Sequence, residues 1–308
     1  MLFADRLEGG LYGLLIGDAL GVPYEFHAPG NLPPREEIEM SPPADWQRHR
    51  SHGGTPVGTW SDDGAQALCL LASLLHCDRF DAEDFGHRLV NWSDHGYLAV
   101  DGRVFDIGNQ TSRAIERLRA GVPALAAGPS GERDNGNGSL MRVLPLALWH
   151  RGTDKELVRD AALQSQVTHG HPRAQLCCAV YVLWARGALN EVADPWDAAV
   201  ETVKSLLGSE PVFRDELARV LAFASPAGSG YVVDALWSAR IAVQAGPYDV
   251  AVRRAVQFGQ DTDTTACIAG GIAGVRDGAG AIPQRWRDAL RGRELVDPLW
   301  LELLRRWG

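Results

Sequence analysis

The sequence predicts an all-α protein, and three observations lead to that expectation. Strand-like alternation of apolar and polar residues is nearly absent along the 308 residues. Roughly ten or more segments carry helical spacing and are joined by short turns. Hydrophobic residues make up 45% of the chain, which is ample for a substantial core. We therefore expect residues 1–308 to form one compact helical domain.

Composition narrows the classes of partner. The 39 acidic and 30 basic residues give a net charge of −9, and no basic run occurs, so we expect no nucleic-acid groove. The five cysteines have neither zinc-site spacing nor the even count of a disulfide framework. No stretch reaches the roughly 18 apolar residues of a membrane span, and no signal-like segment opens the chain. These features predict a cytoplasmic protein without a membrane partner, and a monomer is our expectation.

The first predicted helix, Asp5 to Leu20, combines a leucine-rich side with several glycines. Each glycine weakens a helix by up to about 1 kcal/mol relative to alanine, so we expect close helix packing in return and a central position. The chain then leaves through Gly21 and Pro23 and reaches Glu25. By itself, a glutamate after a helix is usually solvated.

A long loop is predicted from His27 to Val57, because this segment is rich in Pro, Gly and charge and has little periodicity. A loop of about 30 residues in a compact domain is usually functional or disordered, and we interpret it as a lid over a pocket. Its histidines lack metal-ligand spacing and are expected to face solvent. They are His27, His49 and His52.

Two acidic helix starts form the predicted functional centre. Asp261, Asp263 and Thr264 precede a run of small and apolar residues that suits a tightly packed helix. Alone, this pattern would indicate a helix cap with a spare surface carboxylate. The same chemistry recurs at Ser61-Asp62-Asp63, ahead of a helix from Asp62 to about Cys77.

Both clusters offer oxygen ligands only, which suits Mg²⁺ or Mn²⁺ rather than Zn²⁺. If the two helix starts face each other, their four carboxylates would balance two divalent ions, as in a two-metal hydrolytic site.

Capping residues predict several further helices. Asp81 caps one, and Thr153 opens a capping box for a helix that ends near Val167. From the residues alone, Asp106 is interpreted as the N-cap of a helix from Asn109 to Ala120. Prolines mark the early turns of later helices, and two of them are expected to open the final pair. These prolines are Pro195, Pro211, Pro247, Pro283 and Pro298.

Two segments in the middle of the chain are candidate binding loops. A linker, Pro123 to Asp134, leads to Gly136-Asn137-Gly138-Ser139, which we expect to start a helix running through Leu140 to Leu148. This is not a dinucleotide fingerprint, but exposed N–H groups at a helix start suit a diphosphate or ribose hydroxyls. The turn Thr168-His169-Gly170-His171 precedes another helix, and histidines in such a turn are more often structural.

Five motifs together resemble one family. They occur in the order seen in the ADP-ribosylglycohydrolases, on the side of the dinitrogenase-reductase-activating enzymes, and the likeness spans about residues 6 to 280. Five ordered motifs are far more specific than any one. The motifs are Gly17-Asp18-Ala19-Leu20-Gly21-Val22-Pro23-Tyr24-Glu25, Trp60-Ser61-Asp62-Asp63, Gly136-Asn137-Gly138-Ser139-Leu140-Met141-Arg142, Thr168-His169 and Asp261-Thr262-Asp263-Thr264.

The resemblance implies roles for these residues. Glu25 would gate the metal site, and one carboxylate among Asp62, Asp63, Asp106 and Asp263 would take the proton of the attacking water. Two divalent cations, Mg²⁺ or Mn²⁺, would be held by Ser61, Asp62, Asp63, Asp261, Asp263 and Thr264. The ADP-ribose would be held by Asn137, Gly138, Ser139, Met141 and His169.

The implied activity is hydrolysis of the N- or O-glycosidic bond that joins ADP-ribose to a protein side chain. The segment Phe105-Asp106-Ile107-Gly108 resembles the arginine-directed branch, so ADP-ribosylarginine is the expected substrate. The alternatives are serine-linked or O-acetyl-ADP-ribose, and a catalytically silent ADP-ribose binder. Two departures are that Ser61 stands where threonine is frequent, and Gln260, where glycine is frequent, is expected to narrow the pocket.

Overall fold

The computed structural model describes residues 2–307, and within that range it contains fifteen α-helices and no β-strand. The predicted all-α fold and single compact domain are therefore confirmed. The helices are α1 (Phe3–Gly21), α2 (Asp62–Cys77), α3 (Ala82–His95), α4 (Asn109–Arg119), α5 (Ala124–Ala127), α6 (Leu144–Trp149), α7 (Asp154–Gln166), α8 (Pro172–Leu189), α9 (Pro195–Leu207), α10 (Pro211–Leu221), α11 (Val232–Gln244), α12 (Tyr248–Val256), α13 (Thr262–Asp277), α14 (Gln284–Ala289) and α15 (Arg293–Trp307).

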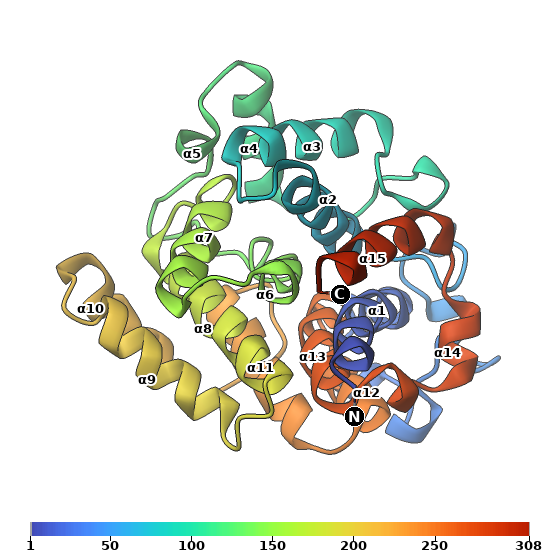
Figure 1. Ribbon diagram of the computed structural model, residues 1–308. Helices are drawn as coiled ribbons and strands as arrows, with labels where there is room; N and C mark the ends of the chain where they lie inside the picture. Colours follow the sequence, from blue (N-terminus) through green and yellow to red (C-terminus); the bar gives the residue numbers. More distant parts are fainter. Residues whose placement is uncertain (1, 308) are drawn as a thin grey trace.

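The α1–α13 pair forms the centre of the fold (Figure 1), and the two helices run antiparallel. A Cβ atom added to Gly17 would lie 2.1 Å from the Ala266 carbonyl oxygen, and one added to Gly274 would lie 1.9 Å from the Gly9 carbonyl oxygen. No side chain larger than hydrogen fits at these crossings. The cost of glycine within a helix is thus offset by direct backbone contact, which confirms the predicted central position of the first helix.

The other helices surround this pair, in which the first third of the chain packs against the last third. Helix α8 is buried along most of its length and contacts α7, α9, α10 and α11, while α2 packs against α3, α6 and α15. In Figure 1, α9 and α10 form one edge of the molecule and α14 lies at the opposite edge. The end of α1 consequently lies beside the start of α13.

Most of the predicted helix starts are correct, and three expectations about helices are wrong. The Asp81 side chain accepts from the backbone N–H of Asp84, and Thr153 forms the capping box with Glu156. Pro298 lies inside α15 rather than at its start, since α15 begins at Arg293.

The segment before α6 is a series of turns, and the helix begins at Leu144. The loop around Asn137 is therefore not a helix start. Asp106 is not a helix cap either, because Gly108 occupies the N-cap position of α4.

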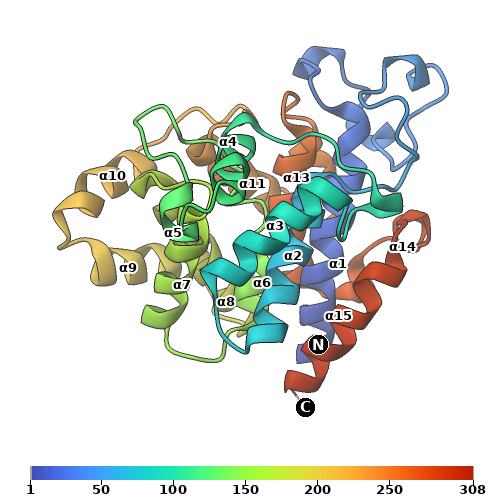
Figure 2. The same cartoon turned by 90° about the horizontal axis from the view of Figure 1, so that it is seen from above.

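The segment between α1 and α2 projects at the end of α1, as Figure 2 shows, and it contains only short 3₁₀ turns. Its Trp46 is buried and packs against Tyr24 with ring centroids 5.0 Å apart. Of its histidines, His49 is exposed as expected, whereas His27 and His52 are half-buried. The expectation of solvent-facing side chains is wrong for these two, because the loop folds back onto the end of α1.

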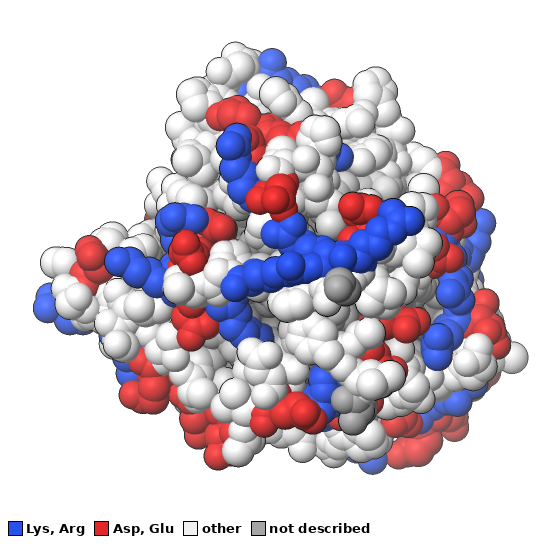
Figure 3. Space-filling model, in the orientation of Figure 1, with Lys and Arg blue, Asp and Glu red and all other residues white. Residues whose placement is uncertain are grey.

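Figure 3 shows a band of basic side chains across the face that carries the start of α1 and the end of α15. Arg151, Arg159 and Arg306 line a hollow of about 210 Å³ there. Arg159 pairs with Asp160 at 2.9 Å, and Arg306 pairs with Asp78, so acidic neighbours balance much of this charge locally. Separately, the helices of residues 2–307 include none that is both long and apolar enough to cross a bilayer.

Candidate active site

A cavity of about 580 Å³ lies where the starts of α2, α4 and α13 converge. Its lining is rich in carboxylates and backbone polar groups. Residues from seven segments of the chain contribute to it, including Glu25, Asp62, Asp106, Gly138, His169 and Asp261. Five of these six residues, all except Asp106, come from the five sequence motifs that carried the resemblance.

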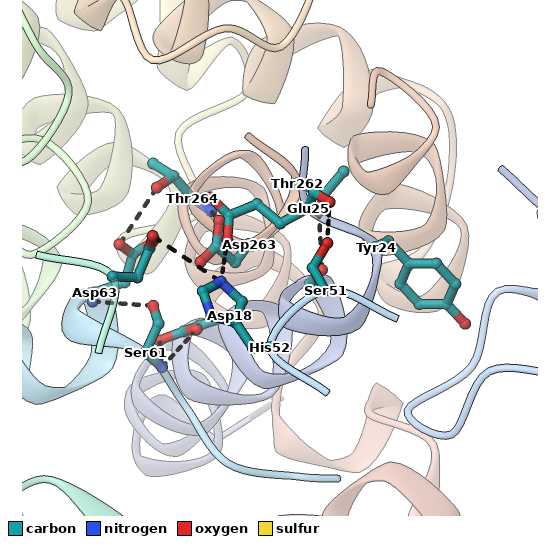
Figure 4. A network of polar contacts seen from close by, with 12 residues as sticks. Asp18, Tyr24, Glu25, Ser51, His52, Ser61, Asp63, Thr262, Asp263 and Thr264 are labelled. Atoms are coloured by element: carbon teal, nitrogen blue, oxygen red, sulfur yellow. Dashed lines mark hydrogen bonds and ion pairs between the residues drawn. The ribbon is translucent and has the colours of Figure 1, made fainter. Parts of the chain in front are cut away.

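The two acidic helix starts meet at this cavity (Figure 4). The Thr264 hydroxyl on α13 donates to Asp63 Oδ1 on α2 over 3.3 Å, although the two residues are 201 positions apart in the chain. The Ser61 side chain caps α2 by accepting from the Asp63 backbone N–H at 3.2 Å. The juxtaposition on which the two-metal interpretation depends is thus present in the fold.

The carboxylates at the junction are held in an environment that opposes their ionisation. Burial, together with neighbouring carboxylates, raises the pKa of Asp62, Asp63 and Asp263 well above the usual range. Burial, with Asp263 as the next cause, also raises the pKa of Glu25. Over the part of the chain that the structure describes, no Lys or Arg forms an ion pair with any of them. When these carboxyl groups ionise, no Lys or Arg among the described residues compensates their charge.

Two oxygens in the cluster are left without partners. Asp63 Oδ2 and Asp263 Oδ2 are buried and accept no hydrogen bond from any residue between 2 and 307. An unpaired buried carboxylate oxygen is costly, and most such groups in folded proteins have a partner. Ligand oxygens of Glu25, Asp261 and Asp263 also lie within 4.8 Å of one another. Hard divalent cations take this donor set, so the residues fit Mg²⁺ or Mn²⁺.

Glu25 is 3% exposed and shares a hydrogen bond with His52 that the sequence did not suggest. His52 Nε2 lies 2.7 Å from Glu25 Oε2 and 4.0 Å from Asp106 Oδ1, so the loop between α1 and α2 reaches into the cluster. Burial lowers the pKa of His52. The only sequence signal was that a histidine stands in a loop expected to cover the pocket.

Asp106 lines the cavity beside these groups, and burial, reinforced by Asp261, raises its pKa to about 7. Its backbone adopts a left-handed conformation with φ of 60°, which is uncommon outside glycine. The residue therefore turns its carboxylate into the cavity at the end of an extended segment rather than capping a helix.

Asp18 is a residue to which sequence reasoning gave no role. It is fully buried on α1, and its carboxylate accepts from the Ser61 N–H at 2.9 Å and from the Gly64 N–H at 2.8 Å. Burial raises its pKa to about 7 despite these bonds. Asp18 thus fixes the first turn of α2 from outside that helix. The available signal was a carboxylate within an apolar, glycine-rich helix.

The predicted substrate-binding residues fall into two groups. Gly138, Met141 and His169 line the cavity, as does Asn137, whose amide donates to Asp261 Oδ2 at 2.8 Å. Ser139 is not among the lining residues.

The Ser139 hydroxyl instead accepts from Ser165 Oγ at 2.9 Å, within the core. Gln260 is also absent from the lining, because its side chain is exposed and donates to the Ala227 carbonyl at 3.2 Å. It does not narrow the pocket.

Fold and site together define a helical protein that gathers carboxylates from distant helix starts around one polar cavity. The chain belongs to the ADP-ribosylglycohydrolase family, whose sequence model matches residues 1–308. This confirms the resemblance and places the protein among glycosidase-type hydrolases.

Individual relatives agree with this assignment. The chain is 33% identical to an ADP-ribosylarginine hydrolase Tri1 of Pseudomonas putida (strain GB-1), over 98% of this chain and 78% of the relative. It is 27% identical to the ADP-ribosyl-[dinitrogen reductase] glycohydrolase of Rhodospirillum rubrum, over 93% and 90% of the two chains. A solved structure described as an ADP-ribosylglycohydrolase-related protein complex superposes with a TM-score of 0.78 at 33% identity, covering 99% of this chain and 98% of the other.

Proposed function

We propose that the protein hydrolyses the bond between ADP-ribose and arginine side chains of modified proteins, with the aid of divalent cations. The observation that carries the proposal is the pair of unpartnered oxygens, Asp63 Oδ2 and Asp263 Oδ2, at the meeting point of two helix starts. The identity to a relative named ADP-ribosylarginine hydrolase supports the choice of arginine.

The proposed cation ligands are the residues of the two helix starts: Ser61, Asp62, Asp63, Asp261, Asp263 and Thr264. When bound, two Mg²⁺ or Mn²⁺ ions supply charge for holding ribose hydroxyls and for activating water. Asp18 keeps the α2 ligands in place through Ser61 and Gly64. Glu25, held by His52, lies at the edge of this ligand set and controls access to it.

Asp106 is the proposed proton-transfer group. Its carboxylate lines the cavity but lies outside the proposed ligand set, and its side chain is 25% exposed. A carboxyl group with a pKa near neutrality suits proton exchange with water or a leaving group. As a carboxylate it also suits the guanidinium of a modified arginine, since such pairs form charge-assisted hydrogen bonds.

The remaining cavity residues hold the substrate in reach of these groups. Asn137 is fixed by its bond to Asp261, which links the loop between α5 and α6 to the start of α13. Gly138 leaves room beside His169, because a Cβ atom there would lie 2.9 Å from the His169 ring. Orientation of a bound ligand by such contacts can supply roughly 7–11 kcal/mol of barrier reduction.

A turnover assay tests the proposal. We expect release of ADP-ribose from an arginine-modified protein with Mg²⁺ or Mn²⁺, loss of release after chelation, and loss in Asp263→Ala. Serine-linked substrate and O-acetyl-ADP-ribose are assayed beside it, and faster turnover of either would replace the arginine assignment. Tight ADP-ribose binding without turnover of any substrate would indicate a silent binder. Full activity after exhaustive chelation would contradict the metal-dependent mechanism.

A further inference from the structure

A chain of buried hydrogen bonds joins Asp62 on one side of the cavity to His169 on the other. Gln66 Nε2 donates to Asp62 Oδ2 at 2.8 Å, and Arg142 Nη1 donates to Gln66 Oε1 at 2.8 Å. The other terminal nitrogen of Arg142, Nη2, donates to Thr168 Oγ1 at 2.7 Å. Thr168 Oγ1 lies 2.7 Å from His169 Nδ1. All five residues are at most 4% exposed.

Arg142 is the centre of this chain and is fully buried. Its Nε and Nη2 also donate to the side-chain and backbone oxygens of Gln164 at 3.2 and 3.1 Å, and its guanidinium lies 5.0 Å from the Phe85 ring centre. Burial lowers the pKa of Arg142 to about 10, so the side chain stays cationic at neutral pH. A guanidinium only donates hydrogen bonds, and each partner must therefore accept.

This requirement fixes the Gln66 amide. Its oxygen has to face Arg142, so its nitrogen faces Asp62. The flipped amide would set two donors against each other and place a carbonyl against a carboxylate, which loses both bonds. Asp62 consequently receives a hydrogen bond on Oδ2 and is held in one orientation at the start of α2.

The same requirement fixes the imidazole of His169. Thr168 Oγ1 accepts from Arg142, and among residues 2–307 His169 Nδ1 is the acceptor within reach of the single hydroxyl hydrogen. Nδ1 therefore accepts, and the ring proton of the neutral imidazole resides on Nε2. Nε2 points toward the loop at the cavity wall, since Cβ atoms added to Gly136 and Gly138 would lie 3.4 and 3.3 Å from it.

We propose that Arg142 is a positioning residue for both sides of the site, acting through Gln66 on Asp62 and through Thr168 on His169. His169 then presents an Nε2–H donor to the cavity, where it binds an acceptor oxygen, a hydroxyl or a phosphate, of the ligand. The identity of that ligand as ADP-ribose rests on the proposed function. The hydrogen-bond directions rest on the structure alone.

We call the contacts from Arg142 through Thr168 to His169 the histidine arm. Nuclear magnetic resonance tests it without turnover or ligand. Long-range ¹H–¹⁵N spectra of histidine-labelled protein assign the His169 tautomer. We expect neutral His169 with the proton on Nε2 in the wild type and in Thr168→Ser, and a mixture of tautomers in Thr168→Val. An Nδ1-protonated ring or an imidazolium in the wild type at neutral pH would overturn the proposal.

Calorimetry with ADP-ribose tests the same arm through affinity. Removing the Thr168 hydroxyl in Thr168→Val should weaken binding about tenfold, since a buried hydrogen bond is lost. Thr168→Ser should bind as the wild type does. The matched control is Tyr181→Phe, which also loses a buried hydrogen bond, from the Tyr181 hydroxyl to the Ile268 carbonyl at 3.0 Å. This bond is not part of the series from Asp62 to His169, so the control should leave ADP-ribose affinity unchanged. Equal affinity of Thr168→Val and wild type would contradict the proposal.

The aspartate arm, which runs from Arg142 through Gln66 to Asp62, is tested by measuring the binding of Mn²⁺ alone. Gln66→Met keeps the side-chain length but removes the donor to Asp62, and we expect Mn²⁺ affinity to fall about 10- to 100-fold, as for other partners of metal ligands. Unchanged Mn²⁺ affinity would overturn this arm. If the tautomer and the Mn²⁺ results hold while no substrate is turned over, the proposed function fails and the role of Arg142 stands.

Discussion

The two ends of the α1–α13 pair both contain buried charge, but only one end neutralises it. At the start of α1, Arg6 pairs with Glu191 and donates to the Arg276 carbonyl at 3.0 Å, which is one of the free carbonyls at the end of α13. At the other end, Asp63 Oδ2 and Asp263 Oδ2 have no partner among the described residues. The same pair of helices therefore has one end where the buried charge is paired and another end where buried carboxylate oxygens have no partner.

Each end also has a cavity, so the presence of a cavity does not identify the site. The cavity at the Arg6 end measures about 390 Å³ and is lined by Arg240 and Trp196 among others. There Arg240 stacks on Trp196 at 4.5 Å, and acidic residues share the lining with the arginines. What distinguishes the acidic end is a pair of buried carboxylate oxygens that have no partner among the described residues. The following experiments probe this contrast, in order of decreasing effect.

Removing one charge at the acidic end should have the largest effect. In Asp263→Asn we expect turnover to fall about 10²- to 10³-fold, as when a preorganised polar group is lost from an active site. The chelated variant should melt at the same or a higher temperature than chelated wild type at pH 8, because a buried carboxylate with a raised pKa is gone. Turnover is measured with metal and melting with chelator. A large loss of stability would instead indicate a structural role for Asp263.

Moving α1 and α13 apart should lower the free energy of unfolding and so affect both ends of the pair. Gly17→Ala places a Cβ atom 2.1 Å from the Ala266 carbonyl oxygen, so the helices must move apart, at a cost of about 1–3 kcal/mol. Gly30→Ala is the matched control, because nothing lies within 4 Å of an added Cβ atom there. Urea unfolding compares the two variants. Equal midpoints would contradict the close backbone packing.

Stability of the chelated protein should fall as pH rises, which is a property of the acidic end. Burial raises the pKa of Asp18 and of Asp106 from 3.8 to about 7. The folded state therefore binds protons more tightly than the unfolded chain. The resulting stabilisation is fully present below about pH 3.8 and is lost as the pH rises through about 7.

Melting temperatures between pH 5 and 8 check this expectation, and Mn²⁺ should flatten the decline by replacing protons. A melting temperature that rises with pH in the presence of chelator would contradict it.

The smallest effect is expected at the end that neutralises its own charge. Glu191 has a side chain that is 65% exposed, so Glu191→Gln should change stability by no more than about 1 kcal/mol. Turnover and Mn²⁺ affinity should match the wild type. A clear loss of either would mean that the two ends are coupled through the helix pair, and the contrast between them would have to be abandoned.

Local signals in the sequence were sufficient for most of the fold. Capping residues such as Asp81 and Thr153 act within one turn, so their effect can be predicted without knowing what packs around them. Pro298 was misplaced because proline within a helix depends on tertiary packing rather than on local preference. The helix expected from Leu140 failed for a similar reason, since the buried side chain of Arg142 and the loop around Asn137 hold that segment in turns.

The candidate site likewise contains residues that local sequence patterns predict and residues that they do not. The two acidic helix starts could be recognised because each is a short, repeated pattern. Asp18 and His52 could not be assigned roles, because their partners lie 43 and 27 positions away and are brought close only by folding. Ser139 shared a motif with cavity residues, but its side chain faces Ser165 in the core. Which side of a loop a residue faces depends on contacts that the motif does not contain.

The pairing of α1 with α13 also determines when during synthesis the protein can become active. Helix α1 is synthesised before residues 262–277, and its glycine face stays uncovered until they are available. Domains are translated over many seconds, and a glycine-rich helix is a poor autonomous folding unit in that interval. Nascent chains that end before α13 therefore contain neither the central contact nor half of the acidic cluster. The candidate site can therefore form only after α13 has been synthesised.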